Sequence, residues 1–412
     1  MNAVLQALHP SPPHALANLR NAFLRSAGDD DAAALDDLLT EHPALTAAHL
    51  LKIGKLVAAK DLRTFPALER ALAAGRPHLR AGSEQDRLHA TAAAAWLAHR
   101  PLLAAHTYTT ISANDPHDLL ALRLAQSGWF FLARRAKVHA VAERAARAWQ
   151  PSDESHDIAL ALLAFGCAEI GAEARAEALS LRSLEIEPRN PYAIHALAHA
   201  LGERGDPAAV VRQLRTRAEH WRVGGRLESH TAWHLAVAEL EMGNVAYAAA
   251  ALDTELLPLA AQGPSAAGDA TDLAWRLDLA GADAAATWDR LADAWSRHHA
   301  PGFWAPDDIL AGIAYVRAER SDRLHALQSR LATGPHLRRC AERAACALTM
   351  PTLTAIEAFA RAKFRTAEAQ LRATIDRMGG SLLQRELFEL TLEASRRRAP
   401  SATPPEEWRI PA

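Results

Sequence analysis

Apolar residues follow the three- and four-residue spacing of amphipathic helices along most of this chain, and no alternating strand pattern competes with it. The apolar stretches come in pairs that are separated by short turns. In residues 157–188, one stretch runs to Gly171, a second follows at once, and Pro188 closes the unit. This pattern predicts a series of helical hairpins, because glycine ends helices and proline cannot continue one.

The predicted hairpins repeat at a nearly constant interval. Successive turn glycines are 34, 38 and 38 residues apart (205 − 171, 243 − 205 and 281 − 243), at Gly171, Gly205, Gly243 and Gly281. A helix–turn–helix period of about 34 residues is typical of tetratricopeptide repeats, and longer loops between repeats explain the wider intervals. Further hairpins are expected in residues 307–331 and 352–378, where another residue replaces the turn glycine, and degenerate hairpins are expected upstream.

From this repeat we predict an all-α fold, a right-handed superhelix (α-solenoid) of about ten to twelve stacked tetratricopeptide-like hairpins. We divide the chain into degenerate N-terminal hairpins (1–150), central histidine-bearing repeats (151–260), C-terminal repeats (261–396) and a tail (397–412). The Pro, Ser and Thr content of the tail predicts disorder, with Trp408 as a residue that could dock back.

The composition favours helices and limits the kinds of partner that we expect. The chain is 50% hydrophobic but only 6% aromatic, and its net charge is −2 with both signs interspersed. No basic stripe with aromatic residues is present, so we expect no nucleic-acid partner. Every long apolar run contains a charge, so we expect no membrane span. The start of the chain lacks a signal-peptide pattern, and the three cysteines are too scattered for a disulfide framework, so we expect a reducing, cytoplasmic compartment.

Two histidine pairs are the most informative chemical feature of the sequence. Each pair is spaced i, i+4 on the first helix of a hairpin, and the two hairpins are neighbours: His195/His199 and His230/His234. This spacing places both members of a pair on one helix face. Counted back from the turn glycines, all four fall on the side of the helix that lines the concave groove. Because an imidazole titrates near neutral pH, all four are candidate catalytic residues.

The same repeat frame suggests further groove residues. The candidate binding residues are Trp233, Asp272, Trp275, Asp308 (next to Asp307) and Arg385, whose guanidinium could bind a carboxylate or phosphate. Packing is the alternative explanation for the histidines and tryptophans, and Asp308 could simply cap a helix that begins at Ile309. We expect several other histidines at the surface or in loops: His9, His14, His42, His49, His298 and His299.

Several segments resemble the tetratricopeptide repeat protein 38 family, in the same order and across roughly residues 40–395. They are DLLALRLAQ, AFG, NPYAIHALAHALGERGD, HTAWHLAVAELEMGN, DLAWRLDLAG and GGSLLQRELFELTLEA. The resemblance implies a helical-repeat fold with a polar groove, and it implies no particular reaction. The chain departs from the family at two places, where Leu310 and Leu382 replace family histidines.

Three functions fit these features. The first is binding of a small molecule or peptide in the groove, with His199 and His234 as acid and base if the protein is an enzyme such as a cyclase, isomerase, dehydratase or hydrolase. The second is a non-catalytic scaffold for protein partners. The third is a histidine-ligated metal or haem site. We assign no cofactor and no metal ligand, because Ala196 and Thr231 replace the glutamate of an HExxH motif and no Cys or Glu stands at ligand spacing.

Overall fold

The computed structural model describes residues 12–27, 32–224, 226–282, 284–333, 340–375 and 381–399, with only the backbone of residues 226, 340–346 and 382. These residues are helical, with no β-strand among them. The elements are α2 (Pro12–Arg25), α3 (Ala32–Glu41), α4 (Thr46–Ala58), η1 (Leu62–Thr64), α5 (Phe65–Ala81), α6 (Glu84–Leu97), α7 (Pro101–Asn114), α8 (Leu119–Phe131), α9 (Arg135–Ala146), α10 (His156–Ala168), α11 (Glu173–Ile186), α12 (Pro191–Glu203), α13 (Pro207–Thr216), α14 (Ala218–Trp221), α15 (Arg226–Glu241), α16 (Val245–Ala251), η2 (Leu252–Leu256), α17 (Leu257–Ala260), α18 (Pro264–Leu279), α19 (Ala285–His298), α20 (Ala305–Arg317), α21 (Ser321–Thr333), α22 (Cys340–Ala360), α23 (Phe364–Thr374) and α24 (Leu382–Arg398).

The hairpin turns share one backbone geometry. The four predicted turn glycines have φ between 76° and 85°, in the left-handed region that glycine adopts without a steric cost. At Gly205, for example, the chain turns with backbone bonds from Gly205 N to Gly202 O (2.8 Å) and from Asp206 N to Leu201 O (3.1 Å). Hairpins without the glycine place another residue in the same left-handed conformation: Ser26, Lys60, His99, Ala133, Glu319 and Ala362.

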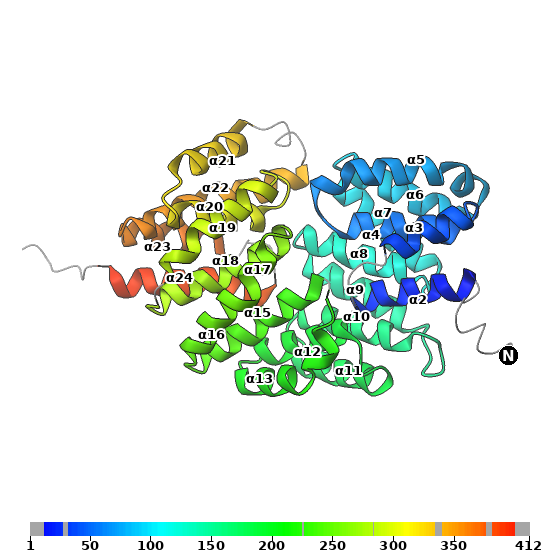
Figure 1. Ribbon diagram of the computed structural model, residues 1–412, viewed down its shortest axis with the longest axis horizontal. Coiled ribbons are helices and arrows are strands. Elements are labelled where there is room, and N and C mark those ends of the chain that lie inside the picture. Colours follow the sequence, from blue (N-terminus) through cyan, green and yellow to red (C-terminus); the bar gives the residue numbers. More distant parts are fainter. Residues whose placement is uncertain are drawn as a thin grey trace, which may run out of the picture.

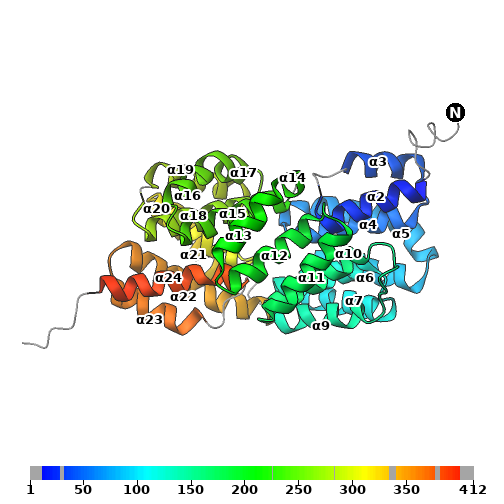
Figure 2. The same cartoon turned by 90° about the horizontal axis from the view of Figure 1, so that it is seen from below.

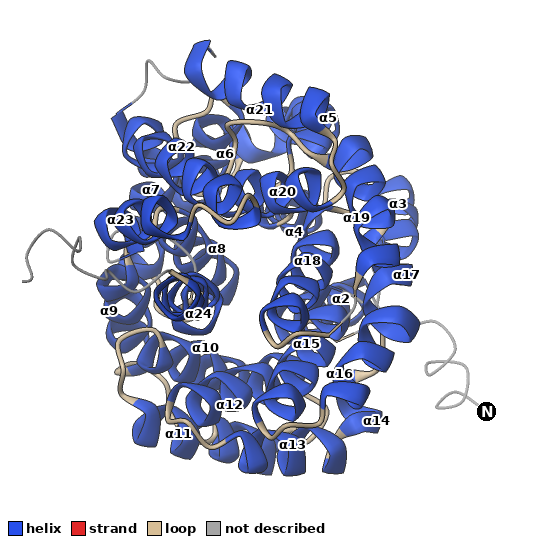
Figure 3. Cartoon of the chain, turned by 90° about the vertical axis from the view of Figure 1, so that its left-hand side faces the viewer, coloured by secondary structure: helices blue, strands red, loops and turns tan. Residues whose placement is uncertain are grey.

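The hairpins stack in chain order around a common axis, so the predicted all-α solenoid of hairpins is confirmed. The N-terminal and C-terminal hairpins lie at opposite ends of the long axis (Figures 1 and 2), and the helices surround a central space when the molecule is seen along that axis (Figure 3). The apolar face of α12 is buried within its hairpin: Ile194, Leu197, Ala198 and Leu201.

The loop between α19 and α20 closes the superhelix on itself. Its Phe303 ring lies 5.3 Å from the Phe131 ring and 5.9 Å from the Phe65 ring (centroid distances). Trp304 stacks on Phe131 at 6.1 Å with an interplanar angle of 14°. Aromatic contacts of this kind join hairpins that are about half the chain apart in sequence. The α19–α20 loop therefore links the second half of the solenoid to α5 and α8.

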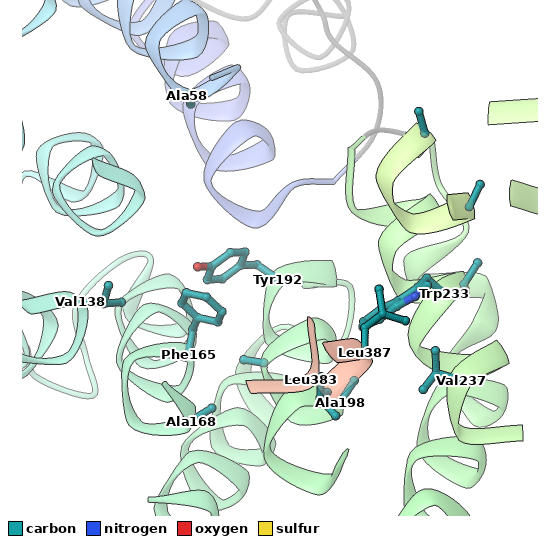
Figure 4. Packing of buried hydrophobic residues seen from close by; sticks show 14 of the residues in the cluster. Ala58, Val138, Phe165, Ala168, Tyr192, Ala198, Trp233, Val237, Leu383 and Leu387 are labelled. Atoms are coloured by element: carbon teal, nitrogen blue, oxygen red, sulfur yellow. The ribbon is translucent and has the colours of Figure 1, made fainter. Parts of the chain in front are cut away.

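Two helices flank the central space. Arg25 at the end of α2 forms a bidentate pair with the buried Asp157 of α10 (2.8 and 2.9 Å), and Asn190 donates to the same carboxylate (2.9 Å). On the other side, Leu383 and Leu387 of α24 pack beside α12 and α15 (Figure 4). These contacts position the helices that carry the site described below.

The sequence-based boundaries fall between elements at two places, since residue 150 separates α9 from α10 and residue 260 ends α17. Helix α24 continues to Arg398 and so includes the first two residues of the predicted tail, and the rest of the tail from residue 400, with Trp408, lies outside the described residues. Cys167 is buried, as a small core residue should be, whereas the side chains of Cys340 and Cys346 are outside the described set. No described helix is both long and apolar enough to cross a membrane.

Candidate functional site

The predicted groove is a cavity of about 1200 Å³ at the centre of the molecule. Its lining residues come from both halves of the chain, including α2, α4 and α8 from the N-terminal half and α12, α15, α18, α20 and α24 from the rest. Phe131, Phe303 and Trp304 form part of its wall. The same aromatic residues that join the two halves of the superhelix therefore also line the cavity.

The local sequence fixes the helix that carries the first histidine pair. Asn190 caps α12 by accepting a hydrogen bond from the Ala193 backbone N–H (3.1 Å), and Pro191 occupies the first helical position. The apolar side chains of α12 face the inside of the hairpin. His195 and His199 therefore lie on the face of α12 that is directed toward α15. The second pair lies on α15, which packs against α12.

All four histidines meet in one place, and we call them the four-histidine cluster. Each of them offers a ring nitrogen, and these four nitrogens all lie within 4.8 Å of one another. The shortest ring-centroid distances are 4.5 Å between His195 and His199, 4.6 Å between His199 and His234, and 4.7 Å between His230 and His234. The i, i+4 spacing predicted the pairing within each helix, and the packing of α12 on α15 brings the pairs together.

The hydrogen bonds of the cluster are incomplete. The Nε2 atoms of His195 and His199 are 3.0 Å apart, and His199 Nδ1 lies 3.4 Å from Glu203 Oε1. His230 Nδ1 lies 2.7 Å from Asp269 Oδ1. By contrast, His195 Nδ1 and His234 Nε2 are buried, and no described residue gives either of them a partner.

Burial keeps three of the four imidazoles neutral. It lowers the pKa of His199 to about 3, with electrostatic interaction with His230 as a smaller cause, and it lowers the pKa values of His195 and His234 well below 6.5. The pKa values of two buried carboxyl groups beside the cluster are shifted upward. Desolvation raises the pKa values of Glu169 and Glu203 to about 8. At neutral pH, His195, His199 and His234 are therefore uncharged and lie next to mostly protonated carboxyl groups.

The predicted binding residues on α15 and α18 have different surroundings. Trp233 lines the cavity, stacks on His230 (5.1 Å, 7°) and donates its indole N–H to Asp272 (2.8 Å). Asp272 also lines the cavity. Trp275 does not, which corrects its expected placement: its N–H donates to Thr391 of α24 (2.9 Å), and its ring packs against Phe359. Helix α24 covers this face of α18, which the repeat frame alone leaves open.

Asp308 and Arg385 also line the cavity. Helix α20 begins at Ala305 and not at the expected Ile309, so Asp308 lies in its first turn. The Asp308 carboxylate accepts hydrogen bonds from the backbone N–H of Gly302 (3.0 Å) and contacts His299 Nε2 (2.7 Å). The His299 side chain is only 4% exposed, so it is not a surface residue.

The remaining expected positions lie as follows. Arg385 is buried, and no described residue accepts a hydrogen bond from its Nε atom. Leu310 lines the cavity, while the side chain of Leu382 is outside the described set. His49 is also buried, with Nε2 2.9 Å from the Pro43 carbonyl oxygen, in contrast to its expected surface position. His298 is half-buried, with Nε2 2.6 Å from the Ala261 carbonyl oxygen.

Sequence reasoning missed four charged residues of this region. Glu203 stands four residues after His199, so a Glu does accompany a histidine pair at helical spacing, contrary to our expectation. Arg276 stands four residues after Asp272 and bonds to it (2.7 Å). Both i, i+4 relations are visible in the sequence. The roles of Glu169 and Asp269 are not, because only tertiary packing brings them to the cluster.

The hairpin period, the left-handed turns and the polar concave site define a tetratricopeptide-like helical-repeat protein. No protein-family model matches the chain. A similar solved structure is the crystal structure of the APC/C hetero-tetramer Cut9–Hcn1, with 14% identity, a TM-score of 0.41, and a match over 84% of this chain and 63% of that chain. This chain thus spans less than two thirds of that neighbour.

A second similar structure is that of Rap protein complexed with competence and sporulation factor. It has 11% identity and a TM-score of 0.41, and the match covers 86% of this chain and 96% of that chain. At these identities, both structures resemble this chain in helical-repeat architecture alone.

Proposed function

We propose that this protein binds a small molecule or a short peptide in the central cavity. The observation that carries the proposal is the cavity itself, about 1200 Å³ in volume and lined by both apolar and polar residues. Enclosed sites with a few convergent polar groups are typical of small-molecule and cofactor sites. A volume above the usual range suits a large metabolite or a peptide of a few residues.

The walls suggest that the ligand carries a negative charge. Arg385 is buried at the cavity wall with an Nε atom that lacks a partner among the described residues, and Arg123 lines the wall nearby on α8. Burial lowers the pKa of Arg385, with a further contribution from Arg135, so a ligand anion would relieve an unfavourable site. A carboxylate or phosphate group fits a guanidinium bidentately.

Two other functions remain as alternatives. A scaffold would bind protein partners along the concave surface, as helical-repeat proteins commonly do, but it does not need the aromatic wall that Phe131 and Trp304 form. General acid catalysis by His199 and His234 is disfavoured because burial lowers both pKa values far below neutrality, so neither ring is present as the imidazolium that a general acid needs. Membership of the tetratricopeptide repeat protein 38 family and a cytoplasmic location remain proposals that rest on the sequence.

A cavity-filling variant tests the proposal. Leu310 lines the cavity, so Leu310→Trp should reduce its volume, whereas the half-buried Leu181 on α11 does not line it and Leu181→Trp is the matched control. The untagged proteins are dialysed against a mixture of peptides and metabolites, and retained compounds are identified by mass spectrometry. We expect compounds that the wild type and Leu181→Trp retain and Leu310→Trp loses. Equal retention by all three proteins would contradict binding in the cavity.

A further inference from the structure

The four-histidine cluster combines features that a packed core does not need. Its members are 1–5% exposed at His199, His234 and His195, yet two of their ring nitrogens lack a partner among the described residues. A buried polar atom without a hydrogen bond costs about 1–3 kcal/mol. Four imidazoles together therefore lower the stability of the chain unless something binds to them.

The spacing of the nitrogens suits a single ion. Two nitrogens bound to one ion at about 2.0–2.1 Å are about 3.4 Å apart in a tetrahedral site and at most about 4.2 Å apart in any site. The four ring nitrogens lie within 4.8 Å of one another, and the two Nε2 atoms of His195 and His199 are 3.0 Å apart. Small side-chain rotations would bring the set to coordination distance.

We propose that the four-histidine cluster binds one divalent first-row transition metal ion that prefers nitrogen ligands, of which zinc is the reference case. The cluster supplies four imidazoles and no thiolate, a ligand set that suits zinc, copper, iron or nickel and does not suit the oxygen-preferring magnesium and calcium. The proposal is argued from the four-histidine cluster alone and does not depend on the anion proposed above at Arg385.

Carboxyl groups behind the rings support this assignment. Metal-binding histidines usually direct their second nitrogen to a carboxylate or a carbonyl, which orients the ring and fixes the tautomer. Asp269 contacts His230 Nδ1 at 2.7 Å and also accepts from Ser229 Oγ at 3.1 Å, so it is held in place. Glu203 contacts His199 Nδ1 at 3.4 Å. In both rings the Nδ1 contact leaves Nε2 for the ion.

The charge balance points the same way. Two buried carboxyl groups lie beside the rings: neither oxygen of Glu169 has a partner among the described residues, and the Glu203 side chain is 1% exposed. A divalent cation at the cluster would supply the positive charge that this buried acidic group lacks. His195, His199 and His230 line the cavity, so the ion would face it and could take a further ligand there.

A metal titration of the untagged, chelator-treated full chain tests the proposal. Zinc is measured by elemental analysis after desalting, and cobalt(II) is followed by its visible absorption, with no organic ligand present. We expect one ion per chain and a cobalt spectrum of four- or five-coordinate nitrogen ligation. His234→Gln should weaken binding at least 100-fold, and Asp269→Asn should weaken it about 10- to 100-fold.

The matched control is His89→Gln. His89 is also buried and also contacts a carboxylate, Asp118, at 2.7 Å, but it lies on α6 outside the cluster. Its substitution should leave the affinity within about threefold. An ion that binds equally well to wild type and to His234→Gln would overturn the proposal, as would a wild type that retains no stoichiometric ion.

X-ray absorption of the zinc-loaded wild type does not depend on whether a variant folds. A first shell of about four nitrogen scatterers at about 2.0–2.1 Å supports the site, and a shell of oxygens alone overturns it. Because the titration uses the ion alone, a failure here leaves the cavity-binding proposal intact. Failure of the Leu310→Trp experiment likewise leaves the metal assignment intact.

Discussion

Two buried polar groups on neighbouring first helices of this solenoid differ in how completely they are satisfied. On α18, Arg276 donates to Asp272 (2.7 Å), to Glu386 (2.9 Å) and to the Leu383 carbonyl oxygen (2.7 Å). On α12 and α15, the four-histidine cluster leaves His195 Nδ1 and His234 Nε2 without a described partner. Both groups lie in helical-repeat positions of the same kind, and both are almost fully buried.

The difference separates a satisfied structural network from a candidate ligand site. Every strong donor of Arg276 has an acceptor, and two of its three partners belong to α24, so this network holds the last helix against the solenoid. Burial raises the pKa of Asp272, while Arg276 and Trp233 oppose that shift. The cluster instead is buried with two of its ring nitrogens lacking a described partner, which is typical of sites that bind a ligand.

The largest expected effect comes from breaking the satisfied network. Arg276→Met should lower the free energy of unfolding by about 3–5 kcal/mol, because it leaves the Asp272 and Glu386 carboxylates without their partner. Chemical denaturation followed by circular dichroism measures the change. The control is Arg361→Met, which removes an exposed i, i+4 ion pair with Glu357 (2.7 Å) and should cost less than about 1 kcal/mol. Equal losses in the two variants would contradict a structural role for Arg276.

A smaller effect, which depends on pH, is expected from Glu169 beside the four-histidine cluster. The pKa of Glu169 is about 8 in the folded protein against 4.5 in the unfolded chain, so its contribution to stability is present below pH 4.5 and is lost as pH rises toward 8. Glu169→Gln cannot ionise. In metal-free protein, the stability of this variant relative to wild type should therefore rise by about 2–4 kcal/mol between pH 5 and pH 9.

Denaturant midpoints across that pH range measure this difference. Glu177→Gln is the control, because Glu177 is partly exposed in its ion pair with Arg204. A Glu169→Gln difference that stays constant with pH would show that this carboxyl group is already ionised in the folded protein.

The smallest effect separates the two groups most directly. His234→Leu replaces an imidazole whose Nε2 atom lacks a described partner, so it should raise the stability of the metal-free protein by about 1 kcal/mol. Thermal unfolding in the presence of a chelator measures it. A loss of more than about 2 kcal/mol would instead make the cluster a structural network like that of Arg276. With saturating zinc the wild type should instead be more stable than His234→Leu, because only the wild type gains the binding energy of the ion.

Much of the local structure was predictable because it depends on nearest neighbours in the sequence. Gly171, Gly205, Gly243 and Gly281 marked the turns, since glycine adopts the left-handed conformation freely. The degenerate turns at Ala133 and Ala362 were harder to predict from the sequence, because alanine has no preference for the left-handed conformation. The i, i+4 histidines were predictable as pairs for the same local reason, as helical geometry alone places them on one face.

The sequence by itself thus determined the helices, their pairing into hairpins and which face of α12 and α15 carries the imidazoles, because periodicity and turn chemistry act over a few residues. Only the tertiary structure decided what those faces meet. Closure of the cavity by Phe303 on Phe131, and the covering of Trp275 by Thr391, join residues more than 100 positions apart. Such contacts depend on the small rotation from each hairpin to the next, which accumulates along the solenoid and leaves no local signal in the chain.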